Sequence, residues 1–298
     1  MTALDLSRLP DGLRLGTSSF SSPDWCGSFY PAGMPPEQFL GYYATRLRTV
    51  EIDATWHVMP ARRTIESWAQ KVPDGFVFSL KTPRSITHDR YLQDCEDDWR
   101  RFLEVTELLG EKRGPILLQF PYVARSQNPE EYRTGLDFRR RLERFLPSIP
   151  EGGRFVVEIR NRTWLTPELC DLLRSRHIVL ALVDYYTMPG PVELVQRLDP
   201  VTGGFAYIRF LGNHRLMDQH VAQAREEGRR HSDWGELLID RTEELRSWIP
   251  PIQDLLRRVP EVYAYFNNHY AGFAPGSLEL FVKLWEERLA AEAASSSR

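Results

Sequence analysis

The chain has 298 residues, 42% of them hydrophobic and 27% charged, and is long enough to bury one large α/β core or two small ones. A formal net charge of -3 and a pI near 6.2 disfavour a general binder of nucleic acid or membrane surfaces, although they leave room for a local basic patch. The three cysteines lie far apart without a CxxC pair, which disfavours a disulfide framework and a cysteine-ligated metal.

The first third of the chain predicts strands and helices in alternation. Residues 1–10 lack a basic segment followed by an apolar run, and no stretch reaches the roughly 18 apolar residues of a membrane span, so we expect a cytoplasmic protein without a membrane partner. The run LRLGTS at 13–18 indicates a strand that opens onto a loop rich in Ser, Pro, Gly and aromatic residues. Residues 36–47 have helical spacing, and TVEIDAT at 49–55 alternates as a strand does, with Glu51 and Asp53 on one face.

The pattern continues along the rest of the chain. Strands are expected at 76–81, 115–120, from 155, and at 178–184, 205–210 and 262–266. Helices are expected at 62–70, 94–109 and 130–146, after the N-cap pair Thr166 and Pro167, from Asp240 with Glu243 as a capping-box-like pair, and after Ser277, with fraying from Ala290.

About eight strands alternating with about eight helices predict a single TIM-type (β/α)8 barrel over residues 1–290, followed by a frayed tail at 291–298. An open doubly wound sheet is the alternative. The first βα turn lacks GxGxxG and the chain lacks GxxxxGK[ST], which disfavours that sheet and also dinucleotide and P-loop nucleotide sites.

Polar side chains stand at the carboxyl ends of the predicted strands, where a barrel of this type builds its site. In FVVEIRNRTW at 155–164, Glu158 and Arg160 are two residues apart and face the same side of the strand. They are either part of a site or a structural ion pair that closes the barrel. Lys81, Gln119 and Arg209 end other strands in the same way.

Several motifs resemble those of the YecE-like family, also called domain of unknown function 72. They are GTSSF with PDWCGSFYP, TVEIDATW, FSLKTPRSITH, LLQFP, VVEIRNRTW, YIRFLGN and YFNNHYAG, and they span essentially the whole chain. The resemblance implies a TIM-type barrel in bacterial and archaeal cytoplasm, without an established reaction. The family's polar motif positions fall on Glu51, Lys81, Gln119, Glu158, Arg160, Arg209, Asn267 and Asn268. The family commonly has Asn where this chain has Asp53, which adds a negative charge near Glu51.

For the chemistry, we expect Glu51, Lys81 and Glu158 to be catalytic. Paired carboxylates can divide acid and base roles, as in a glycosidase, but strands two and five are not the usual glycosidase positions. Lys81 would be a Schiff-base lysine if desolvated, or else an ion-pair partner of Glu51 or Glu158, which we favour. The expected substrate-binding residues are Gln119, Arg160, Arg209, Asn267, Asn268 and Trp164.

The expected function is an enzyme, a hydrolase or a lyase or isomerase, that acts by acid/base chemistry on a small phosphorylated or carboxylated, sugar-like ligand. Arg160 and Arg209 would clamp the anion, with Arg84, His88 and His214 adding charge to the mouth; alternatively the arginines neutralise the carboxylates. Aromatic loop residues would stack on a ring or staple the loops; they are Trp25, Phe29, Tyr30, Trp56 and Trp164.

Three further questions stay open at this point. No cofactor is predicted, and a divalent metal on Glu51, Glu158, Asp184 and His269 is an alternative that the nearby cations oppose. The second function class is a binding protein without catalysis, for nucleic acid or another ligand, that would use a basic run. That run contains Arg225, Arg229, Arg230 and His231. The sequence does not define an oligomeric state.

Overall fold

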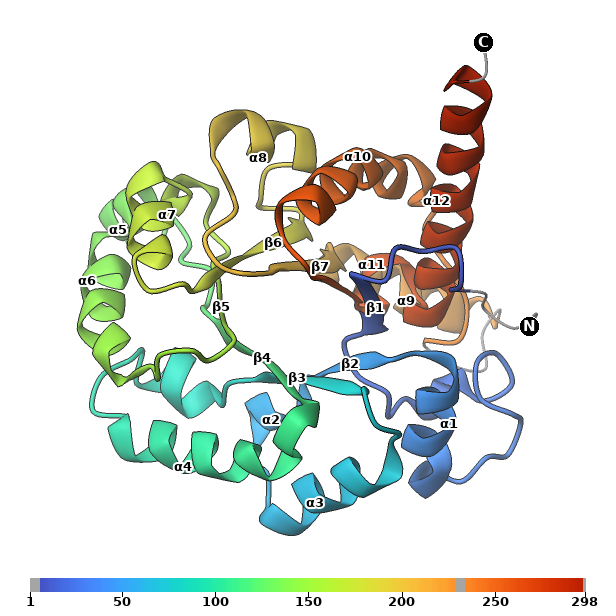
Figure 1. The fold of residues 1–298 in the computed structure, drawn as a ribbon, viewed down its shortest axis with the longest axis horizontal. Helices are drawn as coiled ribbons and strands as arrows, with labels where there is room; N and C mark the ends of the chain where they lie inside the picture. The colour runs from blue at the N-terminus through green and yellow to red at the C-terminus, as the bar shows by residue number, and fades with distance from the viewer. Residues whose placement is uncertain (1–5, 229–233, 297–298) are drawn as a thin grey trace.

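Eight parallel strands form a nearly closed barrel surrounded by helices in the computed structural model, which describes residues 6–228 and 234–296 (Figure 1). The strand order is β1-β8-β7-β6-β5-β4-β3-β2. The strands are β1 Leu13–Thr17, β2 Thr49–Ile52, β3 Val77–Lys81, β4 Arg113–Gln119, β5 Phe155–Glu158, β6 Val179–Tyr185, β7 Ala206–Gly212 and β8 Val262–Phe266. The predicted TIM-type barrel is therefore confirmed.

The barrel closes between β1 and β2, its two edge strands, through a parallel bridge between Ser18 and Glu51. The strands approach closely below this bridge because β1 has a glycine there. A Cβ atom on Gly16 would lie 2.4 Å from the carbonyl oxygen of Thr49, a distance that no side chain tolerates. The closure is thus made by a short contact rather than by a full ladder of hydrogen bonds.

Helices surround the strands in Figure 1. They are α1 Phe39–Arg46, α2 Ala54–His57, α3 Arg62–Lys71, α4 Glu96–Thr106, α5 Pro129–Thr134, α6 Leu136–Phe145, α7 Pro167–Arg174, α8 Pro191–Arg197, α9 His214–Glu226, α10 Thr242–Arg258, α11 Asn268–Ala271 and α12 Ala274–Ser296. None of the helices in the described part of the chain is long and apolar enough to cross a membrane.

Alternation along the strands divides the apolar side chains into two cores. Val50 and Ile52 of β2 pack outward with the large side chains of the helices. The inner core fills the barrel with residues such as Leu117 and with stacked rings of Tyr207, Tyr263 and Tyr265. The interior is therefore packed, and any site has to lie at one end of it.

The structure differs from the predicted elements in several places. β2 ends at Ile52 and α2 follows, because Thr55 Oγ1 donates to the carbonyl oxygens of Ile52 and Lys81. The helix expected at 130–146 divides into α5 and α6 at Gly135, where φ is 59°. Helix α10 begins at Thr242 rather than Asp240, although Asp240 does accept from the Thr242 backbone N–H. Helices α8, α9 and α11 were not predicted from the sequence, and α12 continues to Ser296.

Candidate functional site

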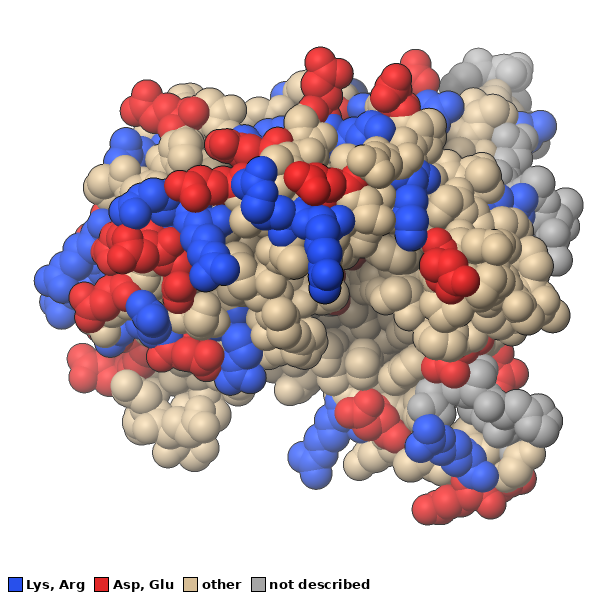
Figure 2. Space-filling model, turned by 90° about the horizontal axis from the view of Figure 1, so that it is seen from below, with Lys and Arg blue, Asp and Glu red and all other residues tan. Residues whose placement is uncertain are grey.

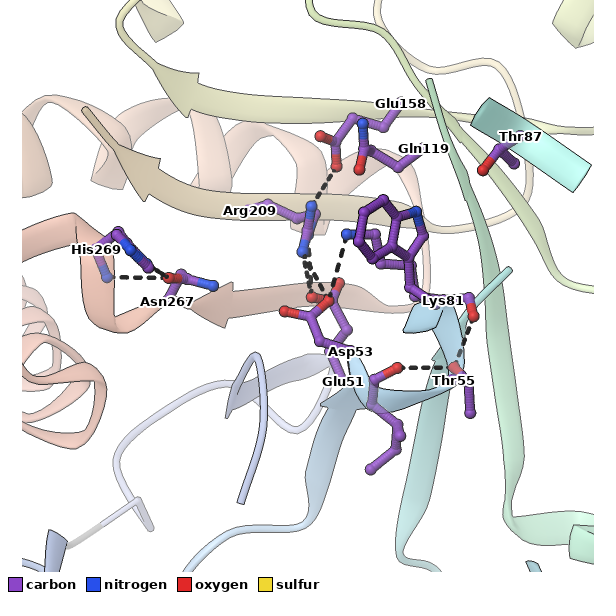
Figure 3. A network of polar contacts seen from close by, with 12 residues as sticks. Glu51, Asp53, Thr55, Lys81, Thr87, Gln119, Glu158, Arg209, Asn267 and His269 are labelled. Carbon is purple, nitrogen blue, oxygen red and sulfur yellow. Dashed lines mark hydrogen bonds and ion pairs between the residues drawn. The ribbon is translucent and has the colours of Figure 1, made fainter. Parts of the chain in front are cut away.

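Arg209 of β7 lies at the centre of a polar network at the carboxyl ends of the strands (Figure 3). Its Nη2 and Nε donate to Oε1 of Glu51 at 2.6 and 3.1 Å, and its Nη1 donates to Oε2 of Glu158 at 2.7 Å. The arginine side chain is 1% exposed and both glutamates are 0% exposed. One guanidinium thus ties β7 to β2 and β5 across the barrel, and it occupies the space between the two carboxylates.

Burial and charge act in opposite directions on these groups. Burial raises the pKa of Glu51, and the neighbouring charge of Arg209 only partly opposes it. Burial would also raise the pKa of Glu158, but the charges of Arg160 and Arg209 overcome it and lower the pKa to about 2. The pKa of Arg209 is raised despite its burial, because Glu158, Glu51 and Asp53 surround it. Glu158 therefore stays ionised near neutral pH.

Tyrosines support the network from below. Tyr207, two residues before Arg209 on the same face of β7, donates its hydroxyl to Glu51 Oε2 at 2.6 Å. Tyr265 of β8 shares hydrogen bonds with the hydroxyls of Thr49 and Ser79 at 2.6 and 2.7 Å. Neither tyrosine was predicted from the sequence, although the i, i+2 spacing of Tyr207 from Arg209 places the two side chains on one face of the strand.

Lys81 ends β3 above this network, as the sequence predicts, but its partner is different. Its Nζ lies 3.8 Å from Oδ1 of Asp53, rather than beside Glu51 or Glu158, and 4.8 Å from the centre of the Trp56 ring. Asp53 also lies 3.4 Å from Nη2 of Arg209, so that two cations share it. Burial lowers the pKa of Lys81, and the attraction of Asp53 opposes that shift only in part.

Arg160 follows β5 and stands on the other side of Glu158. Its Nε donates to Glu158 Oε1, and its guanidinium carbon lies 4.4 Å from the centre of the Tyr185 ring. Gln119 of β4 is also buried beside Glu158 in Figure 3 and donates to the carbonyl oxygen of Phe120. The structure therefore brings together six of the nine predicted site residues: Glu51, Lys81, Gln119, Glu158, Arg160 and Arg209.

Histidines lie at the rim, but not as the cations that we expected. Burial, together with the charges of Lys81 and Arg84, lowers the pKa of His88 to about 4, and its Nδ1 lies 3.3 Å from the indole Nε1 of Trp56. Burial and the neighbouring His269 lower the pKa of His214 to about 3. Both imidazoles are therefore neutral at pH 7. Arg84 is engaged by Asp89 at 2.9 Å.

Three predicted binding residues have structural partners away from this network. Trp164 stacks on Phe138 with ring centres 5.0 Å apart and donates to the carbonyl oxygen of Glu131. The side-chain oxygen of Asn268 accepts from Trp25 Nε1 and from the backbone N–H at the start of α12. Asn267 caps α11 by accepting from the His269 backbone at 2.9 Å.

Most of the aromatic loop residues are staples. Trp25, Phe29 and Tyr30 are buried against one another, with Trp25 and Tyr30 stacked at 6.0 Å, and Trp164 is buried as described above. Trp56 is the member of that predicted set that stands beside Lys81. Of the two aromatic roles left open by the sequence, stapling therefore fits Trp25, Phe29, Tyr30 and Trp164.

The residues weighed for a metal do not converge. Asp184 accepts from Trp248 Nε1 at 2.8 Å and from the Tyr270 hydroxyl at 3.2 Å, while Glu51 and Glu158 bond to Arg209. Within residues 6–228 and 234–296, no three side chains of His, Cys, Asp or Glu are grouped so that they could hold a metal ion.

Of the basic run considered for nucleic acid, Arg229, Arg230 and His231 lie outside the described residues, and Arg225 lies at the end of α9. Acidic and basic side chains are interspersed on the face seen in Figure 2, on the side of the barrel that carries α3 and α4. That face therefore shows no continuous basic surface.

Comparison with known proteins places the chain among relatives of similar length. Residues 14–297 match the family model described as "Protein of unknown function DUF72". The UPF0759 protein YunF of Bacillus subtilis is 22% identical over 293 residues, 85% of this chain and 95% of YunF. The UPF0759 protein YecE of Escherichia coli K12 is 29% identical over 119 residues, 40% of each chain.

Two crystal structures share the fold. A DUF72 family protein of Thermotoga maritima is 30% identical, with a TM-score of 0.67 that covers 92% of this chain and 99% of the other. A DUF72 family protein of Enterococcus faecalis is 20% identical, with a TM-score of 0.63 over 92% of this chain and 95% of the other.

Proposed function

The chain belongs to the family described as protein of unknown function DUF72, and we propose that it is an enzyme that acts on a small anionic ligand at the mouth of its barrel by acid/base chemistry. The mouth is the end at which the carboxyl termini of the strands meet around Arg209. Lys81 is the proton-transfer group of this proposal and Arg160 is the anion clamp.

The observation that carries the proposal is the different depth of the charged side chains. Glu51 and Glu158 are fully buried and form ion pairs with Arg209. The exposed fraction of the side chain is 27% for Asp53, 11% for Lys81 and 10% for Arg160. A ligand at the mouth would meet these last three groups first. Glu51 and Glu158 then act as positioning residues that hold Arg209 and Arg160, rather than as the acid and the base.

The chemistry follows from the two exposed cations. A guanidinium has five N–H donors, and Glu158 takes one from Nε of Arg160, so that donors remain for a phosphate or carboxylate. A lysine with a lowered pKa loses its proton more readily than an ordinary lysine, so that it can take a proton from the ligand and return it. Proton transfer of this kind serves lyase, isomerase and hydrolase reactions alike.

The test uses binding and turnover together. Purified protein is screened by thermal shift against phosphorylated and carboxylated sugars and acids, and each ligand that raises Tm is assayed for turnover. Arg160→Gln should reduce the shift, and Lys81→Met should keep most of it but lose turnover. Lys112→Met is the matched control, because Lys112 is a part-buried lysine that bonds the carbonyl oxygens of Ala69 and Val72 instead.

Two results would contradict the proposal. Full turnover by Lys81→Met would remove Lys81 from the reaction, and an unchanged shift with Arg160→Gln would remove the clamp. A ligand that shifts Tm but is never converted would favour the alternative of a binding protein without catalysis.

A further inference from the structure

Lysine is scarce in this chain, and one of its few lysines occupies the mouth. Of the 38 lysines and arginines, four are lysines and the other 34 are arginines. Lys71 and Lys283 are exposed, and Lys112 is a part-buried partner of backbone carbonyl groups. The chain thus uses arginine wherever it needs a cation beside a carboxylate in the network, except at position 81.

The difference between the two residues is chemical. An arginine stays protonated at any relevant pH and is a poor nucleophile, whereas a lysine that loses its proton is a primary amine that attacks carbonyl carbons. A position that needed charge alone could have been arginine, as positions 160 and 209 are. The amine at position 81 therefore points to a use of its nitrogen lone pair.

The surroundings of Lys81 favour the neutral amine. Its Nζ rests over the indole of Trp56, and the positive charges of Arg209 and Arg160 act on it. Two carboxylates act in the opposite sense: Asp53, at 3.8 Å and shared with Arg209, and Glu158, whose effect on the pKa of Lys81 is smaller. Apart from those two carboxylates, the amine has an apolar wall and cationic neighbours, and burial and the charges of Arg209 and Arg160 disfavour its ammonium form.

We infer that Lys81 forms a Schiff base with a carbonyl ligand that also carries an anionic group, a 2-oxo acid or a phosphorylated aldehyde or ketone. This inference rests on the proposed function, since Arg160 would hold the anionic group. It names the substrate class of the same site and makes Lys81 a nucleophile.

The steps balance without a further reactant. The neutral amine attacks the carbonyl carbon, a C–N bond forms, and the carbonyl electron pair moves to oxygen, which takes up a proton from the solvent. The nitrogen gives one proton to Asp53, the nearest carboxylate. Asp53 then returns this proton to the carbinolamine hydroxyl, which leaves as water while the nitrogen lone pair completes the C=N bond of a protonated imine.

The probe for the test is glyoxylate, a small 2-oxo acid, with cyanoborohydride as hydride donor at pH 7. Hydride adds to the imine carbon and leaves a stable secondary amine, which peptide mass spectrometry assigns to one lysine. An ordinary lysine with a pKa near 10.4 is almost entirely protonated at this pH, and the neutral fraction rises about tenfold for each unit by which the pKa falls. Because burial lowers its pKa, Lys81 should be labelled faster than Lys71 and Lys283, the internal references, and the ratio of the labelling rates is the measured effect.

Two additions separate this inference from the proposed function. Glycolate, which lacks the carbonyl group, should slow the labelling of Lys81 but not of Lys71. Lys81→Arg should keep the glycolate-induced shift in Tm and lose the adduct, because arginine supplies the charge without the amine.

Labelling of Lys81 at or below the rate of Lys71 overturns the Schiff base. If glycolate still raises Tm in an Arg160-dependent manner in that case, the proposed function stands without it. Selective labelling of Lys81 without any protection by glycolate supports the imine and counts against the anion clamp.

Discussion

Replacement of Arg209 by methionine tests whether one guanidinium holds the mouth together. Methionine keeps an unbranched stem but is shorter and has neither charge nor donors, so the variant removes three hydrogen bonds to Glu51 and Glu158 and the contact with Asp53. Glu158 keeps Arg160 as a partner. Glu51 keeps only the Tyr207 hydroxyl among the partners described above, so it becomes a buried carboxylate without a counter-charge.

The expected cost follows from that imbalance. Removal of one partner from a buried ion pair destabilises a protein by about 3 to 5 kcal/mol, because the remaining charge is uncompensated. In the variant, burial holds the pKa of Glu51 above its unfolded value. A carboxyl group with a raised folded pKa is least costly below its unfolded pKa and becomes more costly as pH rises through the folded one. The variant should therefore lose less stability at pH 5 than at pH 8.

Urea unfolding of the wild type and Arg209→Met at both pH values measures this loss. The double variant Arg209→Met with Glu51→Gln should recover about 1 to 2 kcal/mol, because glutamine removes the stranded charge. Arg154→Met is the matched control: Arg154 pairs with Glu261 in a part-exposed setting, and its loss should cost no more than about 1 kcal/mol. A cost below that of the control, or no recovery in the double variant, would refute the idea that Arg209 compensates Glu51.

Three other predictions concern the same region. Glu158 has a lowered pKa of about 2, so the stability that its carboxylate contributes is present above the unfolded pKa near 4.5 and is lost as pH falls. Between pH 5 and pH 3 the free energy of unfolding of the wild type should fall by about 2 kcal/mol, a loss that Glu158→Gln should not show. Urea titration at each pH measures this difference. Asn268→Ala should lower the free energy of unfolding by about 1 to 2 kcal/mol, because it removes the oxygen that accepts from Trp25 Nε1 and from the first backbone N–H of α12. Labelling of Lys81 by glyoxylate should not change. A large fall in that labelling would indicate that Asn268 is a binding residue. Gly212→Ala should lower Tm, because φ is 66° there and a Cβ would lie 2.8 Å from the His269 carbonyl oxygen; an unchanged Tm in calorimetry would show that the backbone can move at no cost.

Local sequence patterns predict the barrel and the position of polar side chains at the carboxyl ends of its strands. They do not predict which of these side chains pair with one another. Glu51 and Arg209 could be placed because each stands on an alternating strand, and alternation fixes the face. Arg209 pairs with Glu51 and Glu158, and Lys81 pairs with Asp53. This pairing depends on distances across the barrel, which spacing along the chain does not encode. The end of β2 at Ile52 could not be predicted for the same reason, since it depends on a hydrogen bond from Thr55 to the distant residue Lys81.

Aromatic residues were the harder class to assign. Trp164 looked like a mouth residue because it ends a motif rich in charge, yet it stacks on Phe138, whose ring comes from α6. Tyr207 had no predicted role, yet its hydroxyl donates to Glu51. A large ring with a polar tip serves either role, and only the fold decides between them.

Glu51 has two roles that meet at one backbone position. Its side chain receives Arg209, and its residue makes the bridge to Ser18 by which β1 and β2 close the barrel. Any ligand that breaks the ion pair between Arg209 and Glu51 would therefore also affect the short contact between β1 and β2 that closes the barrel. The rates of amide hydrogen exchange in β1 and β2 would then change when a ligand binds at the mouth, so that these rates could be used to detect ligand binding.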